Sequence, residues 1–205
     1  MGRLAAQATL FGFGEPRLDL GFSGARRTPL SAGAWIEHVP GWLEGHEALF
    51  ETLRDTTAWQ HQRRRMYERV VDVPRLVASV PDDGPGHPVL GHASLALSAR
   101  YGPALSEVSL AYYRDGQDSV AWHGDRLGRL VDDTVVAILS VGSPRRFLLR
   151  PAAGGPSRAY ELGWGDLLVM GGSCQRTWQH TVPKVASAGP RISIQFRPDV
   201  DDDPA

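Results

Sequence analysis

His123-Gly124-Asp125 places an imidazole and a carboxylate two residues apart. On a β-strand, or at its end, side chains at positions i and i+2 point to the same face. The pair can therefore present two metal ligands to one point in space. By itself it is a weak signal, because a surface pair or a buried structural histidine explains most such motifs.

A third candidate ligand lies downstream, in Trp178-Gln179-His180, after a strand-like segment and a pair of glycines. Two histidines and one carboxylate form the facial triad of non-haem iron(II) oxygenases, which leaves three coordination positions for other ligands. Zinc accepts similar ligands, so His123, Asp125 and His180 predict a metal site without choosing the metal.

The segment Arg191–Arg197 alternates strictly between polar and apolar residues. Such alternation predicts a β-strand with one set of side chains on each face. The polar face carries Arg191, Ser193, Gln195 and Arg197. An ordinary half-buried strand with a solvated polar face has the same pattern. Because this segment follows the candidate iron ligands closely in the sequence, however, its arginines are also candidates to bind the far carboxylate of a small dicarboxylate. A planar guanidinium does this through two parallel hydrogen bonds.

These motifs belong to a larger ordered set between residues 110 and 197. Its pieces are Tyr113–Asp125, Gly165–Met170, Thr177–Pro183 and Arg191–Arg197. In order and spacing the set resembles the AlkB family of nucleic-acid dealkylating dioxygenases, most closely its animal demethylase branch. The resemblance covers somewhat under half of the chain, and an ordered set is far more specific than any single motif.

The resemblance implies a fold, cofactors and residue roles. The core would be a jelly roll, and the metal would be iron(II), with 2-oxoglutarate and dioxygen as co-substrates. His123, Asp125 and His180 would bind the iron. The residues that would hold 2-oxoglutarate are Tyr113, Arg191, Ser193 and Arg197.

The sequence departs from the family pattern at three places. Ala111 and Ser193 stand where the family usually has asparagine. A serine can still donate one hydrogen bond but an alanine side chain donates none, so we expect an altered 2-oxoglutarate site. Arg126-Leu127-Gly128 follows Asp125, where relatives that repair bases often have an acidic residue. This departure bears on the recognition of a cationic alkylated base.

The resemblance also implies a nucleotide-recognition lid upstream of the core, and residues 59–75 stand in that place. Arginines that hold phosphate and aromatic rings that stack on an extruded base suit such a lid. The predicted substrate-binding residues are Trp59, Arg64, Arg65 and Tyr67. A solvated basic surface with its aromatic side chains in the core would have a similar composition.

Periodicity and turn residues predict the elements that must position these side chains. Helical spacing predicts helices over Gly41–Thr57 and Leu90–Arg100, and the stretch Pro74–Pro88 is rich in proline and glycine, which predicts an exposed loop. After Gly102 we expect short strands at Glu107–Tyr113, Val120–His123, Thr134–Val141, Arg146–Arg150, Ser157–Leu162, Asp166–Met170 and Arg191–Arg197. Closely spaced short strands are typical of a double-sheet jelly roll or another sandwich.

We therefore expect an α+β, mainly β, fold in a single domain over residues 1–205. Residues 1–105 would form an N-terminal extension with helices and the lid. Residues 106–198 would form the jelly-roll core.

Composition limits the classes of protein to consider. Hydrophobic residues make up 42% and charged residues 22% of 205, which is typical of a soluble globular protein. No stretch predicts a membrane span, and the first residues do not predict a signal peptide. Cys174 is the single cysteine, so we expect no internal disulfide. We expect a cytoplasmic monomer, and the net charge of −1 neither favours nor excludes a nucleic-acid partner.

Together these features predict iron(II)- and 2-oxoglutarate-dependent dealkylation of bases in alkylated single- or double-stranded nucleic acid. An alternative is a 2-oxoglutarate-dependent hydroxylase of a small molecule or a protein side chain. The missing acidic residue favours that alternative, and the arginine-rich residues 59–75 disfavour it. A non-catalytic jelly roll that binds sugar or nucleic acid is a further alternative, which the complete triad and the two arginines disfavour.

Overall fold

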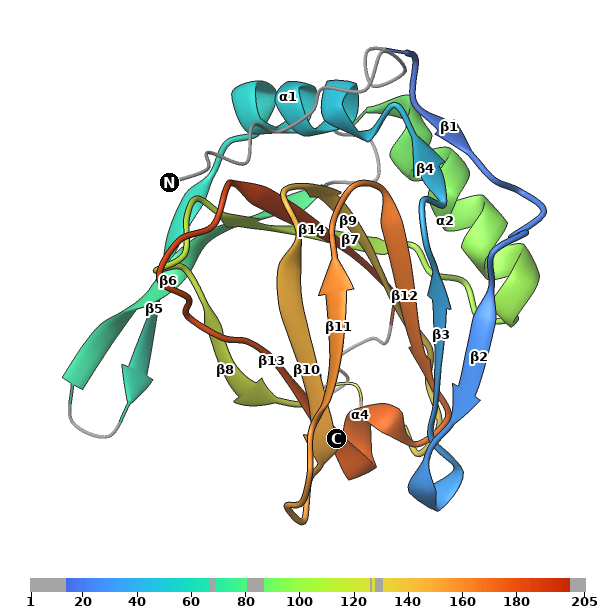
Figure 1. Cartoon of the computed structure of the whole chain (residues 1–205), viewed down its shortest axis with the longest axis vertical. Coiled ribbons are helices and arrows are strands. Elements are labelled where there is room, and N and C mark those ends of the chain that lie inside the picture. The colour runs from blue at the N-terminus through green and yellow to red at the C-terminus, as the bar shows by residue number, and fades with distance from the viewer. Residues whose placement is uncertain (1–13, 67–68, 81–86, 126, 128–130, 200–205) are drawn as a thin grey trace, which may run out of the picture.

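Two antiparallel sheets face each other in the computed structural model, which describes residues 14–66, 69–80, 87–125, 127 and 131–199 (Figure 1). For residues 62–66 and 69–72 it describes the backbone alone. Within these residues the large sheet has the order β2-β3-β12-β9-β14-β7-β6-β5. Its strands are β2 (Arg26–Pro29), β3 (Trp35–Val39), β5 (Gln60–Met66), β6 (Arg69–Val80), β7 (Glu107–Tyr113), β9 (Val136–Gly142), β12 (Asp166–Gly171) and β14 (Arg191–Arg197).

The small sheet, in the order β11-β10-β13-β8, covers part of the large one. Its strands are β8 (Val120–His123), β10 (Arg145–Pro151), β11 (Arg158–Leu162) and β13 (Trp178–Val182). A separate short ladder joins β1 (Arg17–Leu18) to β4 (Leu43–Glu44). The mainly β, jelly-roll expectation is confirmed.

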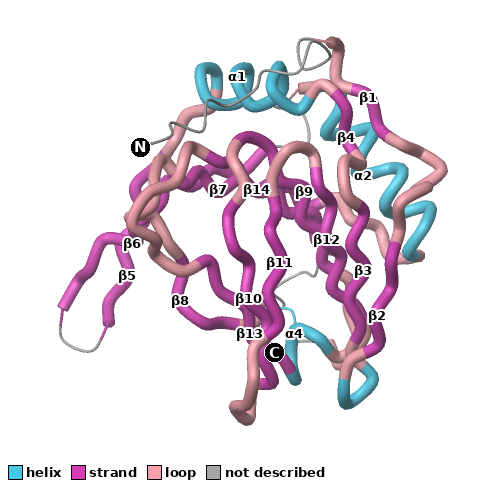
Figure 2. Tube along the Cα trace, viewed as in Figure 1, coloured by secondary structure: helices cyan, strands magenta, loops and turns pink. Residues whose placement is uncertain are grey.

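The helices lie outside the strands (Figure 2). The described helical segments are η1 (Ser31–Gly33), α1 (His46–Thr56), α2 (Pro88–Tyr101) and the single turn α4 (Cys174–Thr177). None of the described helices is long and apolar enough to cross a membrane. The second predicted helix is confirmed as α2. The first begins at His46 rather than Gly41, because Gly45 has a left-handed backbone conformation and the residues just before it form β4.

The large sheet buries both of its faces. Its outer face packs against the helices, where Leu139 and Ile194 share one hydrophobic cluster with Leu49 of α1. Its inner face packs against the small sheet, where Ile138 lies in a second cluster with Phe147. Because apolar area removed from water is stabilising at about 25 cal/mol per Å², the two clusters fix the large sheet as a rigid support.

Strand β14 of the large sheet carries apolar side chains on one face and polar side chains on the other. Ile192, Ile194 and Phe196 are fully buried in the outer cluster. The opposite face is also buried rather than solvated, since Arg191 is 1% exposed and Ser193 4% exposed. The predicted alternation is confirmed, and its polar face forms an interior surface.

The predicted loop at Pro74–Pro88 is wrong in its first half, which belongs to β6. This strand pairs with β5 on one side and β7 on the other. Pro74 has no N–H to donate, and it lies where the β5–β6 register is interrupted. Proline is tolerated within a sheet at such irregularities. The carbonyl of Pro74 instead accepts a hydrogen bond from the amide of Ser119, at 2.7 Å.

The β5–β6 hairpin extends past the edge of the paired sheets and projects from the body of the molecule (Figure 1). Strands from the first half of the chain complete the large sheet, because β3 pairs with β12 and β6 pairs with β7. The division at residues 105 and 106 stays a prediction, and the sheet is continuous across it.

Candidate active site

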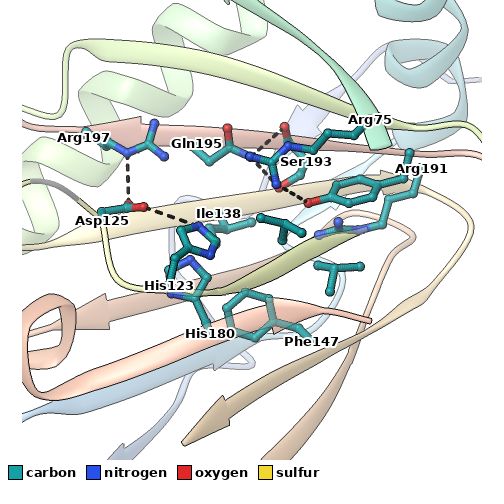
Figure 3. Close-up of a pocket in the computed structure, with 13 residues that line it drawn as sticks. Arg75, His123, Asp125, Ile138, Phe147, His180, Arg191, Ser193, Gln195 and Arg197 are labelled. Atoms are coloured by element: carbon teal, nitrogen blue, oxygen red, sulfur yellow. Dashed lines mark hydrogen bonds and ion pairs between the residues drawn. The ribbon is translucent and has the colours of Figure 1, made fainter. Parts of the chain in front are cut away.

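Three candidate metal ligands come together where β8 and β13 pair. His123 ends β8, Asp125 follows it by two residues, and His180 lies on β13 directly opposite His123. One ligand atom from each residue lies within 4.8 Å of the other two. The centroids of the two imidazole rings are 4.3 Å apart, and Figure 3 shows the three side chains at one end of a pocket. The structure thus brings together the triad named from the sequence.

Helix α4 holds the backbone between two of these ligands. The amide of Asp125 donates a hydrogen bond to Oε1 of Gln175, at 3.0 Å. Gly124 lies so close to α4 that an added Cβ would overlap the backbone carbonyl oxygen of Gln175. A side chain at position 124 would therefore push the ligands away from the helix. Sequence reasoning missed Gln175, because nothing in its local pattern distinguishes it from a surface residue.

The charges at this end favour metal binding. Burial by itself would raise the pKa of Asp125, but the charge of Arg197, its hydrogen bond and the neighbouring imidazoles together outweigh burial and hold the pKa below its ordinary value. Arg197 Nε donates to Oδ2 of Asp125 at 3.0 Å, and the other oxygen, Oδ1, lies 4.0 Å from Nε2 of His123. Burial also lowers the pKa of His180 to about 3. At neutral pH the carboxylate is therefore ionised and this imidazole is neutral, as metal ligands must be.

Arg191 lies at the other end of the pocket (Figure 3). Its Nη2 donates to Oγ of Ser140 at 2.6 Å. Its Nε and Nη1 are buried and have no hydrogen-bond partner among the described protein atoms. Burial lowers the pKa of Arg191 to about 10, so the guanidinium remains charged at neutral pH. A buried charge whose donors make no hydrogen bond destabilises the protein unless a ligand accepts those bonds. An anion supplies both the opposite charge and the hydrogen-bond acceptors.

Three arginines surround the ring of Tyr113. The guanidinium carbons of Arg191, Arg145 and Arg75 lie 5.4, 5.7 and 5.9 Å from its centroid. Arg75 lines the pocket and its Nη1 donates to the hydroxyl of Tyr113, at 3.2 Å. Arg145 donates to three backbone carbonyls, at Asp115, Asp118 and Pro183.

Neither Arg75 nor Arg145 was assigned to the site from the sequence. Arg75 stood in the arginine-rich stretch upstream of the core, which was the one signal that pointed to it. Arg145 begins a strand that looked ordinary. Its contacts come from loops far apart in the chain, and no local pattern records them.

The polar face of β14 forms the floor of the pocket between its two ends. Ser193 and Gln195 line the middle of this floor, and Arg197 lies at the triad end. Of the residues predicted to hold 2-oxoglutarate, Tyr113, Arg191 and Ser193 line one pocket with the triad. Arg197 lines it too, but its Nε is paired with a metal-ligand carboxylate.

Of the predicted substrate-binding residues, Trp59 is the one whose side chain is described, and it does not line the pocket. Trp59 packs against Tyr112, with ring centroids 5.2 Å apart, and its indole N–H donates to the carbonyl of Arg54. Arg64 and Arg65 lie in β5 of the projecting hairpin, where the backbone alone is described. Tyr67 lies outside the described residues.

Comparison with known proteins identifies the class. A family model described as the 2OG-Fe(II) oxygenase superfamily matches residues 84–197, which is more than half of the chain. The chain therefore belongs to this superfamily, and the relatives that it resembles are AlkB-like dioxygenases. It is 32% identical to alpha-ketoglutarate-dependent dioxygenase alkB homolog 3 of Mus musculus over 77% of this chain and 64% of that protein. It is 28% identical to DNA oxidative demethylase ALKBH2 of Bos taurus over 66% of this chain and 56% of that protein.

Solved structures extend the likeness to the fold. The structure of OsALKBH1 matches with a TM-score of 0.57 at 14% identity, over 85% of this chain and 100% of that one. The chain spans 64% of the length of the alkB homolog 3 relatives.

Iron(II), 2-oxoglutarate and dioxygen are the cofactor and co-substrates of this superfamily, and the residues present fit them. Two imidazoles and one ionised carboxylate converge as the facial triad requires. The two unused donors of Arg191 face a pocket shared with that triad. A dicarboxylate in this pocket would be held by the metal at one end and by the unused donors of Arg191 at the other.

Proposed function

We propose that this protein removes alkyl groups from damaged nucleic-acid bases, using iron(II), 2-oxoglutarate and dioxygen. The observation that carries the proposal is the pairing, in one pocket, of a candidate metal triad with a buried arginine whose Nε and Nη1 have no hydrogen-bond partner among the described residues. The names of the relatives, dioxygenases and a DNA oxidative demethylase, support the choice of reaction.

The proposed roles follow from position. His123, Asp125 and His180 hold the iron. Arg191 binds the distal carboxylate of 2-oxoglutarate through parallel hydrogen bonds, which a planar fork makes better than a point charge. Arg197 orients Asp125 and keeps it ionised.

When bound, the iron supplies the oxidising power, while 2-oxoglutarate is converted to succinate and carbon dioxide. The protein excludes water and sets the geometry. The substrate changes from N–CH₃ to N–H, and the carbon leaves as formaldehyde.

The hairpin is the proposed contact for the nucleic-acid strand. A base must leave its stack to reach a buried metal centre, and the enzyme must hold the backbone on either side. The β5–β6 hairpin forms one edge of the large sheet, which also carries the pocket, and projects from the body of the molecule (Figure 1). Its strand β5 includes Arg64 and Arg65, and we propose that these residues contact phosphates and that Tyr67 stacks on the extruded base.

Succinate release tests the proposal. The iron-loaded protein is incubated with 2-oxoglutarate and either alkylated or undamaged oligonucleotides of the same sequence. We expect alkylated strands to stimulate succinate release well above the undamaged ones, and His180→Ala to release none. Equal release with both sets of strands would contradict the proposed substrate, and absence of release under all conditions would contradict the proposed chemistry.

A further inference from the structure

A chain of hydrogen bonds runs along the floor of the pocket in a single direction. Arg197 Nη1 donates to Oγ of Ser109 at 2.6 Å, and this hydroxyl donates to Oε1 of Gln195 at 3.2 Å. Nε2 of Gln195 then donates to Oγ of Ser193 at 2.7 Å, and to the carbonyl of Ser193 at 3.0 Å. Figure 3 shows Gln195 and Ser193 side by side between the triad and Arg191. We call these four side chains the relay.

The direction of the relay is fixed at its first member. A guanidinium only donates hydrogen bonds, so the oxygen of Ser109 must accept and its proton must go onward to Gln195. The carboxamide of Gln195 is thereby oriented, with its oxygen toward Ser109 and its NH₂ toward Ser193. The oxygen of Ser193 accepts in turn, and its own proton is used by no bond within the relay.

The position of Ser193 shows where that proton can go. Ser193 lines the pocket and is 4% exposed. On β14 it lies on the same face as Arg191, which faces the pocket with two unused donors. Its neighbour across the sheet on β7 is Ala111, whose side chain offers no hydrogen bond. A carboxylate in the pocket is an acceptor within the reach of this face.

We propose that Gln195 and Ser109 are positioning residues for the co-substrate, which orient the Ser193 hydroxyl to donate a hydrogen bond to 2-oxoglutarate. The inference rests on the assignment of 2-oxoglutarate to this pocket. A hydroxyl that already accepts a hydrogen bond is a stronger donor, so the relay both orients the Ser193 hydroxyl and strengthens the hydrogen bond that it donates. It also begins at Arg197, which holds the triad carboxylate Asp125, and so joins the metal end of the pocket to the co-substrate.

The test is a binding measurement that does not depend on turnover. Manganese(II)-loaded protein is titrated with 2-oxoglutarate by calorimetry in the absence of oxygen. Ser193→Ala removes the proposed donor, and a hydrogen bond to a charged group is worth on the order of 10- to 100-fold in affinity. Gln195→Met keeps the length of the side chain and removes its hydrogen bonds, and we expect about 5- to 50-fold weaker binding.

The double variant makes the test specific. If Gln195 acts through Ser193, the combination of Ser193→Ala with Gln195→Met binds no more weakly than Ser193→Ala alone, because coupled residues are not additive. Ser109→Ala breaks the relay from a different strand, and should weaken binding in the same direction. Ser94→Ala is the matched control, because it removes a serine hydroxyl that donates to the carbonyl of Leu105, among residues that do not line the pocket. Its affinity for 2-oxoglutarate should equal that of the wild type.

Three results would overturn the inference. The first is unchanged affinity in Ser193→Ala. The second is a fully additive loss in the double variant, which would mean that Gln195 acts independently of Ser193. The third is unchanged affinity in Ser109→Ala, which remains decisive if Gln195→Met does not fold. A wild-type protein that binds no 2-oxoglutarate would instead contradict the proposed function itself.

Discussion

Two groups of arginines lie on opposite faces of the large sheet, and they differ in what neutralises them. On the outer side, Glu37 of β3 is buried and accepts hydrogen bonds from Arg27, Arg100 and the hydroxyl of Tyr101. On the pocket side the group consists of Arg191, Arg145 and Arg75 around Tyr113. Among the residues that the structure describes, the buried Arg191 has one neutral partner, Ser140, and two donors without a partner. The arginines of the first group share the carboxylate of Glu37, whereas Arg191 forms no ion pair with a carboxylate of the described residues.

This difference distinguishes arginines that stabilise the fold from an arginine that is available to bind a ligand. A buried charge that is fully hydrogen-bonded and paired contributes to a unique packing, and its removal is expected to affect folding. A buried charge without its partner lowers stability, and such a group persists where ligand binding requires it. We therefore expect substitutions at the Glu37 group to change stability, and substitutions at the pocket group to change binding.

The largest effect is expected at the triad. Asp125→Asn keeps the shape of the side chain and removes its charge, so iron binding and turnover should both be lost. The fold should remain, because the two hydrophobic clusters are untouched. Metal content after loading, turnover and melting temperature are the three measurements. Near-normal turnover in this variant would refute the triad.

Arg191→Ala should weaken 2-oxoglutarate binding by on the order of 2–4 kcal/mol, about 30- to 1,000-fold, because a charge-assisted pair in a desolvated pocket is lost. Arg191→Lys should also bind 2-oxoglutarate poorly, since a lysine ammonium cannot make the two parallel hydrogen bonds of a planar guanidinium. Titration calorimetry measures both affinities.

Arg191→Met sharpens the comparison between the two faces. It removes an unpaired buried charge, so the ligand-free protein should melt no lower than the wild type. Arg100→Met on the outer face should lower the melting temperature and leave 2-oxoglutarate affinity unchanged. A lower melting temperature in Arg191→Met, together with an unchanged melting temperature in Arg100→Met, would contradict the distinction between the two groups.

Glu37→Ala should cost on the order of 1–3 kcal/mol in the free energy of unfolding, because several hydrogen bonds to a buried carboxylate are lost. Denaturant unfolding measures this loss. The matched control is Glu161→Ala, whose partner is Arg146 and whose side chain is 64% exposed. An exposed pair contributes about 0–1 kcal/mol. Equal losses in the two variants would mean that the Glu37 group has no special role in stability.

Glu37 also predicts a dependence of stability on pH. Burial by itself would raise the pKa of Glu37, but hydrogen bonds from Tyr101, Arg100 and Arg27 outweigh it and lower the pKa below its ordinary value of 4.5. The unfolded chain therefore takes up the proton first as the pH falls. The stabilisation is fully present above pH 4.5 and is lost as the pH falls through the folded-state pKa. In Glu37→Gln this part of the acid dependence should disappear from unfolding curves, and its persistence would assign it to other groups.

Strand β5 of the hairpin carries a further set of arginines. If Arg64 and Arg65 contact phosphates, replacing both by glutamine should flatten the slope of log affinity against log salt by about 1 to 2 units. Oligonucleotide binding at several salt concentrations measures the slope, and Arg54→Gln on α1 serves as the control. An unchanged slope would remove the hairpin from the proposed interface.

Local patterns predicted the parts of the site that are local. The strand Arg191–Arg197, the helix α2 and the spacing of His123 and Asp125 all follow from short-range periodicity, and the structure has them. Gln175 and Arg145 could not be predicted, because their partners are brought to them by the packing of distant segments. The strand through Pro74 was missed because proline ordinarily ends a strand, and the irregular register that accommodates it is a property of the paired sheet.

The fate of a methylated base tests the central claim most directly. An oligonucleotide with one N-methylated base is incubated with iron(II), 2-oxoglutarate, oxygen and the protein, and its mass is measured together with formaldehyde and succinate. We predict that the strand returns to the mass of the unmodified oligonucleotide, with one formaldehyde released for each methyl group removed and succinate formed alongside. A strand that keeps its methyl group while succinate accumulates, or that retains an added oxygen as a stable product, would contradict a dealkylating enzyme.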